Sequence, residues 1–104
     1  MSVIHITKDN FDELVLKSEM PVLLDFYADW CGPCRMVAPL VAELAAEHPE
    51  YVIGKINVDE DPDLARKFDV ASIPTLAVVK GGVTVNVAVG VRPKAQILSL
   101  LEQT

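Results

Sequence analysis

Apolar and polar residues follow two different periods along this chain, and each period predicts a different kind of element. Short apolar runs bounded by turn residues indicate strands. We expect five of them, at Val3–Ile6, Val22–Ala28, Val52–Val58, Thr75–Val79 and Val83–Val89. The run Val22–Ala28 is apolar on both faces, which is typical of a central strand that helices cover on both sides.

Four helices are predicted between and after these strands. Asp9 or Asn10 is expected to cap the first helix, whose apolar face is formed by Phe11, Leu14 and Val15. The second helix has its apolar face at Val37, Leu40, Val41 and Leu44. Pro62–Phe68 is predicted as the third helix, and Pro93 opens the fourth.

Proline and glycine set the remaining boundaries. Pro39 lies within the second helix and is expected to kink it, while Pro49 follows the end of that helix. Gly81-Gly82 predicts a two-residue turn between the last two strands, which would make them an antiparallel hairpin. Strands that first alternate with helices and later form a hairpin indicate an α/β domain with a mixed sheet and helices on both faces.

Length and charge narrow the class of protein. The chain has 104 residues without a repeat or a linker, so we expect a single domain over residues 1–104. Its apolar runs are shorter than the roughly 20 residues of a membrane-spanning helix, so no membrane association is expected. The net charge of −6 comes from acidic residues spread along the chain, which argues against nucleic acid as a partner. The segment Met1–Asp9 lacks the features of a secretory signal, so we expect a cytoplasmic protein.

The two cysteines, Cys31 and Cys34, stand at the expected start of the second helix. A disulfide between them would close too small a ring to stabilise the fold much. A zinc site needs four ligands, and only His5 and His48 could add nitrogen, at no familiar spacing, so no metal is expected. A pair of inert buried thiols is a further alternative, but a helix start beside the pair favours reactivity.

A reactive pair has a physical basis at this position. Unpaired N–H groups and the positive end of the helix dipole stabilise a thiolate, so Cys31 is expected to be the attacking and more exposed thiol. Cys34, one turn further in, would attack the mixed disulfide that Cys31 forms with a substrate. Pro33 suits the first helical turn and is expected to tune the redox potential, and Gly32 lets another backbone approach closely. Both are also ordinary turn residues.

The segment Asp29-Trp30-Cys31-Gly32-Pro33-Cys34 resembles the active-site signature of the thioredoxin family. Further matches extend over nearly the whole chain, at Asp25, Pro39, Lys55, Ile73-Pro74-Thr75, Gly82 and Gly90. The resemblance implies the thioredoxin fold, with a central mixed five-stranded sheet flanked by four helices, and the activity of a general protein disulfide reductase. It also implies a monomer that needs no cofactor of its own and is recharged by a thioredoxin reductase.

The resemblance also implies where protein substrates with disulfides would dock. Pro74 matches the proline that thioredoxins hold in cis, although an X-Pro bond is cis only about one time in twenty. The backbone of Ile73 would then pair with an extended substrate segment, and Trp30, Gly90 and Val91 would complete a mostly apolar surface. The alternative for these residues is ordinary core or loop packing.

Asp25 lies within the apolar run of the central strand, so burial is expected to raise the pKa of its carboxyl. The thioredoxin resemblance places Asp25 near Cys34 and implies that it accepts the proton of that thiol. It also places Lys55 near Asp25. The alternative is that Lys55 simply neutralises a buried carboxylate.

Three functional classes fit a redox motif of this kind: a general reductase, an oxidant or isomerase of the secretory kind, and an interaction module that only keeps the fold. By resemblance, Gly32-Pro33 between the cysteines favours the reductase, since the oxidants and isomerases usually carry a histidine there. The chain departs from familiar thioredoxins at Tyr27, Arg35 and Ala71-Ser72. These positions lie around the expected site, where side chains decide which partners fit.

Overall fold

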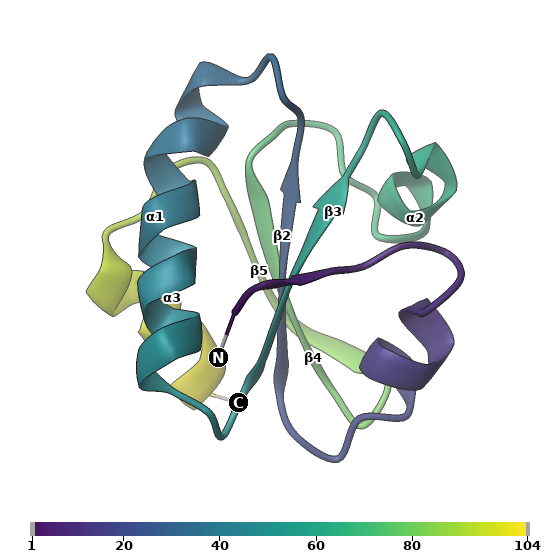
Figure 1. Ribbon diagram of the computed structural model, residues 1–104, viewed down its shortest axis with the longest axis vertical. Helices are drawn as coiled ribbons and strands as arrows, with labels where there is room; N and C mark the ends of the chain where they lie inside the picture. The colour runs from purple at the N-terminus through teal and green to yellow at the C-terminus, as the bar shows by residue number, and fades with distance from the viewer. Residues whose placement is uncertain (1, 104) are drawn as a thin grey trace.

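The computed structural model describes residues 2–103 and contains one mixed sheet between two layers of helices (Figure 1). The strands are β1 (Ile4–His5), β2 (Val22–Tyr27), β3 (Val52–Asn57), β4 (Thr75–Lys80) and β5 (Val83–Val89). They lie in the order β1-β3-β2-β4-β5. Strands β1, β3 and β2 are parallel, whereas β4 is antiparallel to both β2 and β5. The five predicted strands and the mixed sheet are therefore confirmed, with ends that differ from the prediction by at most one residue.

Helices cover both faces of the sheet, as predicted (Figure 1). They are the π-helix η1 (Asp12–Leu16) and the α-helices α1 (Gly32–Glu47), α2 (Pro62–Lys67) and α3 (Lys94–Glu102). Helices α1 and α3 pack on the face that carries Leu23, while η1 and α2 pack on the face that carries Leu24. Because successive residues of β2 point to opposite faces, this one strand contributes to both halves of the core.

The first helix differs from its prediction. Asn10 does not cap it, because its Oδ1 accepts the Thr7 N–H at 2.8 Å and its Nδ2 donates to the His5 carbonyl at 3.0 Å. An asparagine that bonds the backbone before it in this way favours a turn over a cap. The helix that follows is of the π type, since the Lys17 N–H donates to the Asp12 carbonyl at 3.0 Å. Asp9 forms no side-chain cap either.

Helix α1 continues through Pro39 without a break. The kink that was predicted at this residue stays a prediction. The helix ends at Glu47, so Pro49 follows its end as expected. At its other end the first three helical residues are Gly32, Pro33 and Cys34, which places the two cysteines across the start of the helix.

The ends of four strands meet at one edge of the sheet. Strands β2, β3 and β5 end there, and the antiparallel β4 begins there, since Thr75 pairs with both Phe26 and Val89. The loop into α1, the loop after β3, the loop before β4 and the residues after β5 are thereby brought together. This edge positions the candidate site.

The hairpin of β4 and β5 turns at Gly81 and Gly82, which have φ angles of 57° and 79°. Positive φ at both central residues is what a two-residue hairpin turn of the predicted kind requires. Val85 is an extra residue in β5, because Val78 pairs with Asn86 and Val79 pairs with Thr84. A bulge of this kind usually increases the local twist of its strand.

Strand β5 lies at the edge of the sheet and exposes apolar side chains. It carries no charge and no proline. Its alternate residues are exposed valines, between 42 and 62% accessible, at Val83, Val85, Val87 and Val89. The Val87 N–H donates to the Oδ1 of Asn86 at 3.1 Å, so a side chain covers one backbone group of the strand.

Candidate active site

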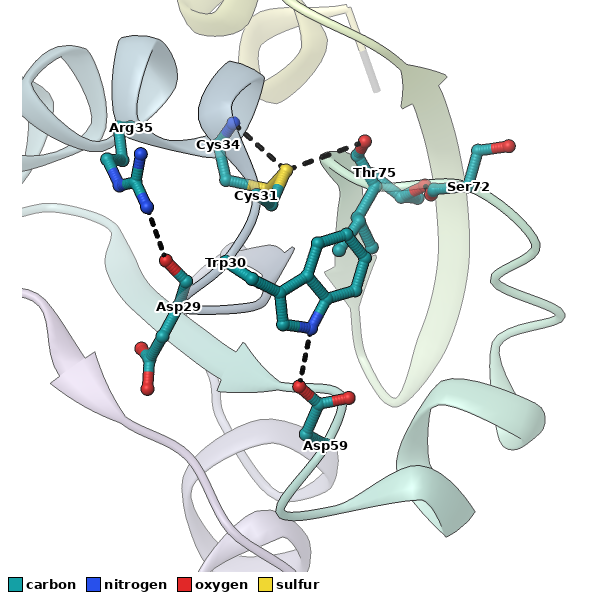
Figure 2. Close-up of a disulfide and its surroundings, with 9 residues drawn as sticks. Asp29, Trp30, Cys31, Cys34, Arg35, Asp59, Ser72 and Thr75 are labelled. Atoms are coloured by element: carbon teal, nitrogen blue, oxygen red, sulfur yellow. Dashed lines mark hydrogen bonds between the residues drawn. A yellow bond between two sulfur atoms is a disulfide. The ribbon is translucent and has the colours of Figure 1, made fainter.

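Cys31 and Cys34 form a disulfide at the start of α1 (Figure 2). Cys31 is the N-cap of the helix, and its Sγ accepts the Cys34 N–H at 3.2 Å. That N–H is one of the donors that a helix start leaves without a helical partner. The helix therefore directs a hydrogen bond and the positive end of its dipole at the sulfur of Cys31.

Exposure does not distinguish the two cysteines in this oxidised form. Both residues are buried, Cys31 at 4% and Cys34 at 3% accessibility. The expectation that Cys31 is the more exposed thiol concerns the reduced protein, so it stays a prediction: here the two sulfurs are joined, and Ile73 packs on the pair. The two cysteines differ in their positions at the helix start: Cys31 is the N-cap, and Cys34 lies within the first turn of α1.

The loop before β4 lies against the disulfide. The Ile73–Pro74 peptide bond is cis, as the resemblance to thioredoxins predicted. The Cys31 Sγ lies 3.9 Å from the carbonyl oxygen of Ile73. The Gly90 N–H donates to the Pro74 carbonyl at 2.8 Å, and Gly90 has a φ of 93°, a conformation that favours glycine. Ile73, Pro74 and Gly90 are thus brought together beside the sulfur, and Val91 follows as an exposed residue.

Trp30 is held in place by a residue that the sequence analysis did not identify. Trp30 is 68% exposed, and its Nε1 donates to the Oδ2 of Asp59 at 2.8 Å (Figure 2). Asp59 follows β3, at the edge where the strand ends meet. Arg35 similarly donates from its guanidinium to the Asp29 carbonyl at 2.9 Å (Figure 2). In the sequence, Asp59 stands out only as part of the run of acidic residues after Val58, and that run does not indicate that Trp30 is its hydrogen-bond partner.

An apolar pocket of about 180 Å³ opens beside the disulfide. It is lined by Trp30, Val58, Ala65, Val70, Ala71 and Ile73. Trp30 and Ile73 were predicted to form a docking surface. Val58, Ala65 and Val70 were not, because they reach the pocket from the loop after β3, from α2 and from the segment after α2, whose placement depends on the fold. Ala71, which departs from familiar thioredoxins, is part of the wall.

Asp25 and Lys55 are neighbours on the sheet. They are register partners in the parallel pair of β2 and β3. Asp25 is buried, and its Oδ1 has no hydrogen-bond partner among the described residues. Burial raises the pKa of the Asp25 carboxyl to about 7, although the nearby Lys55 ammonium acts to lower it. The raised pKa confirms the sequence-based prediction.

A larger cavity of about 570 Å³ gives access to this pair. Its walls come from the N-terminal segment and from α1, with Ser2, Val3, Asp25, Ala38, Pro39, Val41, Ala42 and Lys55. The cavity therefore joins the buried carboxyl of β2 to the helix that carries Cys34. Most of the wall is apolar, which accounts for the high cost of ionising Asp25.

Comparison with known proteins agrees with this geometry. The family model for thioredoxin matches residues 2–103. A thioredoxin from Synechocystis sp. is 48% identical over 100 residues, which are 95% of this chain and 94% of the relative. A thioredoxin from Streptomyces clavuligerus is 48% identical over 94 residues, 90% of this chain and 88% of the relative. A chloroplastic M-type thioredoxin from Chlamydomonas reinhardtii is 43% identical over 94% of this chain and 71% of its own length.

The chain belongs to the thioredoxin family. It is a thiol–disulfide oxidoreductase that reduces disulfides by dithiol–disulfide exchange, and Cys31 and Cys34 are its redox-active pair. Between residues 2 and 103, no helix has the length and apolar character needed to cross a membrane.

Proposed function

We propose that Cys31 is the attacking nucleophile and Cys34 the resolving thiol of a general protein disulfide reductase. The observation that carries this assignment is the hydrogen bond from the Cys34 N–H to the Cys31 Sγ at the start of α1. A donor and a helix dipole aimed at one sulfur stabilise a thiolate on that sulfur. Cys34 lies inside the helix, where it receives no such support.

The two steps transfer two electrons to the substrate. The Cys31 thiolate attacks one sulfur of the substrate disulfide, so that a mixed disulfide forms and the other substrate sulfur leaves as a thiolate. Cys34 then loses its proton and attacks the Sγ of Cys31. The Cys31–Cys34 disulfide forms, the second substrate thiolate leaves, and both substrate thiolates take up protons. A thioredoxin reductase would return the pair to the dithiol form.

Asp25 is the proposed acceptor of the Cys34 proton, with Lys55 beside it as the group that tunes its charge. A base with a pKa of about 7 is matched to proton transfer at neutral pH. The cavity that Asp25 shares with α1, the helix that carries Cys34, has room for water beside the carboxyl. Both features support a catalytic carboxyl over one that Lys55 merely neutralises.

An extended substrate segment is expected to dock beside the disulfide. The Ile73 backbone would pair with the substrate strand, and Trp30, Pro74, Gly90 and Val91 would form the surrounding surface. The pocket of about 180 Å³ between Trp30 and Ile73 supports this placement, since it would accept one apolar substrate side chain. Gly32 and Pro33, both exposed at the helix start, would let the substrate backbone approach the sulfur. We expect a cytoplasmic monomer.

Alkylation of the reduced protein tests the order of the two thiols. Brief treatment with limiting iodoacetamide, followed by peptide mass spectrometry, should show modification of Cys31 well before Cys34, because thiolates react and thiols do not. Faster modification of Cys34 would reverse the assignment.

Trapping tests the two steps directly. Cys34→Ser should accumulate mixed disulfides with substrate proteins through Cys31, visible on non-reducing gels, and Cys31→Ser should accumulate none. In an insulin-reduction assay both variants should lose activity. An active Cys31→Ser protein would show that the chain does not work through this pair.

A further inference from the structure

Tyr27 is a half-buried residue that the mechanism above does not use. It is the last residue of β2, two positions after Asp25, so both side chains lie on the same face of the strand. It is the register partner of Asn57, as Asp25 is of Lys55. The four residues Asp25, Tyr27, Lys55 and Asn57 thus form a rectangle on two neighbouring strands beneath α1.

The ring of Tyr27 contacts the charge that acts on Asp25. The Lys55 Nζ lies over this ring, 5.7 Å from its centroid. This separation is within the range in which a cation is attracted to the face of an aromatic ring. The Tyr27 ring also packs against the group of Ala28, Cys31 and Cys34, so it has neighbours that keep it in place.

Lys55 needs such a contact to stay beside Asp25. The lysine side chain is long, flexible and exposed, and its ammonium is strongly hydrated. Among the described residues, no hydrogen bond or ion pair joins the Lys55 ammonium to Asp25, and the Asp25 Oδ1 has no hydrogen-bond partner. The contact with the Tyr27 ring is the one that restricts the position of the Lys55 ammonium among the described residues.

We propose that Tyr27 is a positioning residue for thiol–disulfide exchange: the face of its ring holds the Lys55 ammonium beside the Asp25 carboxyl. Tyr27 touches neither substrate nor proton in this role. It acts through Lys55, whose nearby positive charge stabilises the ionised form of Asp25 and thereby the form that accepts a proton. The kinetic part of the inference rests on the proposed role of Asp25 as the base.

Few other charged side chains lie near Asp25, Tyr27 and Lys55. Three carboxylates interact electrostatically with Tyr27. They are Asp25 in β2, Asp29 in the loop after β2 and Glu60 in the loop after β3. Glu60 in turn pairs with His5, whose Nε2 lies 3.3 Å from its Oε1. The residues of α1 that line the cavity beside Asp25 and Lys55 are Ala38, Pro39, Val41 and Ala42, which carry no charge. His5 is therefore the group to control for in any pH dependence.

The first test is a pH titration of the Asp25 carboxyl by carbon-13 NMR in the oxidised protein, the form described here. Tyr27→Leu removes the ring and should raise the pKa of Asp25 by about half a unit, the size expected for loss of one cation–π contact. Tyr27→Phe keeps the ring and should leave the pKa close to that of the parent. His5→Gln should leave it unchanged as well.

A double-mutant cycle separates positioning from packing. In a Lys55→Met background there is no ammonium to hold, so Tyr27→Leu should cause no further rise in the pKa of Asp25. An equal rise with and without Lys55 would overturn the proposal, since it would mean that Tyr27 acts through packing or solvent exclusion alone.

A kinetic readout connects the contact to the reaction. Half a pKa unit changes the ionised fraction of Asp25 about threefold at a pH below its pKa and hardly at all well above it. Resolution of a preformed mixed disulfide by Tyr27→Leu should therefore be about threefold slower at pH 6 and unchanged at pH 9. If Asp25→Asn leaves resolution unaffected, the proposed base is wrong, whereas the NMR titration still decides the role of Tyr27.

A measurement on the unaltered protein keeps the proposal testable if Tyr27→Leu does not fold. Protons on the Lys55 side chain near its ammonium should show upfield NMR shifts from the Tyr27 ring current, and Tyr27→Phe should keep them. Lys55 resonances at ordinary positions in the parent protein would overturn the proposal.

Discussion

Asp25 shows how one residue can combine a cost to stability with a use in chemistry. Its carboxyl is buried on the central strand with an oxygen that no described group hydrogen-bonds, and its pKa is raised to about 7. Burial of a polar group without a full set of partners disfavours the folded state. A base of ordinary pKa would be a weak proton acceptor at neutral pH, so the same burial supports the proposed reaction.

Asp25→Asn should be more stable than the parent protein at alkaline pH. The carboxyl has a higher pKa in the folded protein than in the unfolded chain, so the folded state binds more protons between those two values. Stability of the parent is thus fully present below pH 4 and falls as the pH rises through about 7. Asp25→Asn avoids this loss, so its advantage over the parent should grow with pH. The shift from 3.8 to about 7 corresponds to an advantage of about 4 kcal/mol at alkaline pH.

Urea melts of both proteins at pH 5 and pH 9 measure this difference. Asp9→Asn is the matched control, because it removes an exposed carboxyl and should give a nearly constant gap. A gap for Asp25→Asn that stays flat or shrinks with rising pH would contradict the raised pKa.

The residues of the site differ in how far sequence could predict them. The raised pKa of Asp25 follows from a carboxyl inside an apolar strand, which the hydrophobic pattern alone displays. The cis bond before Pro74 was predicted only by family resemblance, since trans is the usual state. The contact between Trp30 and Asp59 joins two loops from different strands, and no local pattern contains it.

At the scale of single elements, the short strand β1 depends on the absence of one side chain. A Cβ at position 54 would lie 2.6 Å from the Cγ1 of Ile6, which is itself fully buried. Gly54 also pairs with Ile4 of β1. Any larger residue must therefore displace Ile6 or separate β1 from β3.

We predict that Gly54→Ala destabilises the protein by about 1–3 kcal/mol, the usual cost of overpacking a core. Denaturant melts measure it, with Gly32→Ala as the control, because a Cβ at position 32 meets no atom within 4 Å. Equal stability of the two variants would mean that the core beneath β1 yields more easily than its contacts imply.

The first turn of α1 allows a prediction about redox potential. Pro33 occupies the second helical position, where its fixed φ stiffens the turn between the cysteines. Pro33→His should make the protein more oxidising, because the turn loosens and an imidazolium stabilises the Cys31 thiolate of the reduced form. Equilibration with glutathione buffers measures the potential. Pro33→Ala loosens the turn without adding charge, so its redox potential should rise less than that of Pro33→His. An unchanged or lower potential for Pro33→His would refute the effect.

Elements were predicted best where one physical signal dominated. The apolar run of β2 and the glycines at positions 81 and 82 left little choice of structure. The first helix was harder, because an asparagine before a helix can cap it or bond the backbone behind it, and here Asn10 does the second. A π-helical turn has no separate hydrophobic period over five residues, so sequence could only predict a helix there.

At the scale of the whole molecule, topology assembles the site from four parts of the chain. The mixed sheet and its helices on both faces were predictable from the order of elements. The pocket between Trp30, α2 and Ile73 was not, because its walls depend on how the helix sits relative to the sheet edge. Residue types identify the chemistry of this protein, and the sheet order decides which side chains surround that chemistry.

The open edge of the sheet has a consequence for handling the protein in solution. Strand β5 ends the sheet with four exposed valines and no charge, and such edges recruit further strands. Concentrated stocks should therefore turn slowly turbid, faster in high salt, where the mutual repulsion of chains with net charge −6 is screened. Val87→Lys should delay this turbidity severalfold in light-scattering time courses, whereas Gln96→Lys on α3, with the same change in net charge, should delay it much less. Equal delays would show that overall charge, rather than this strand, limits the storage life of the protein.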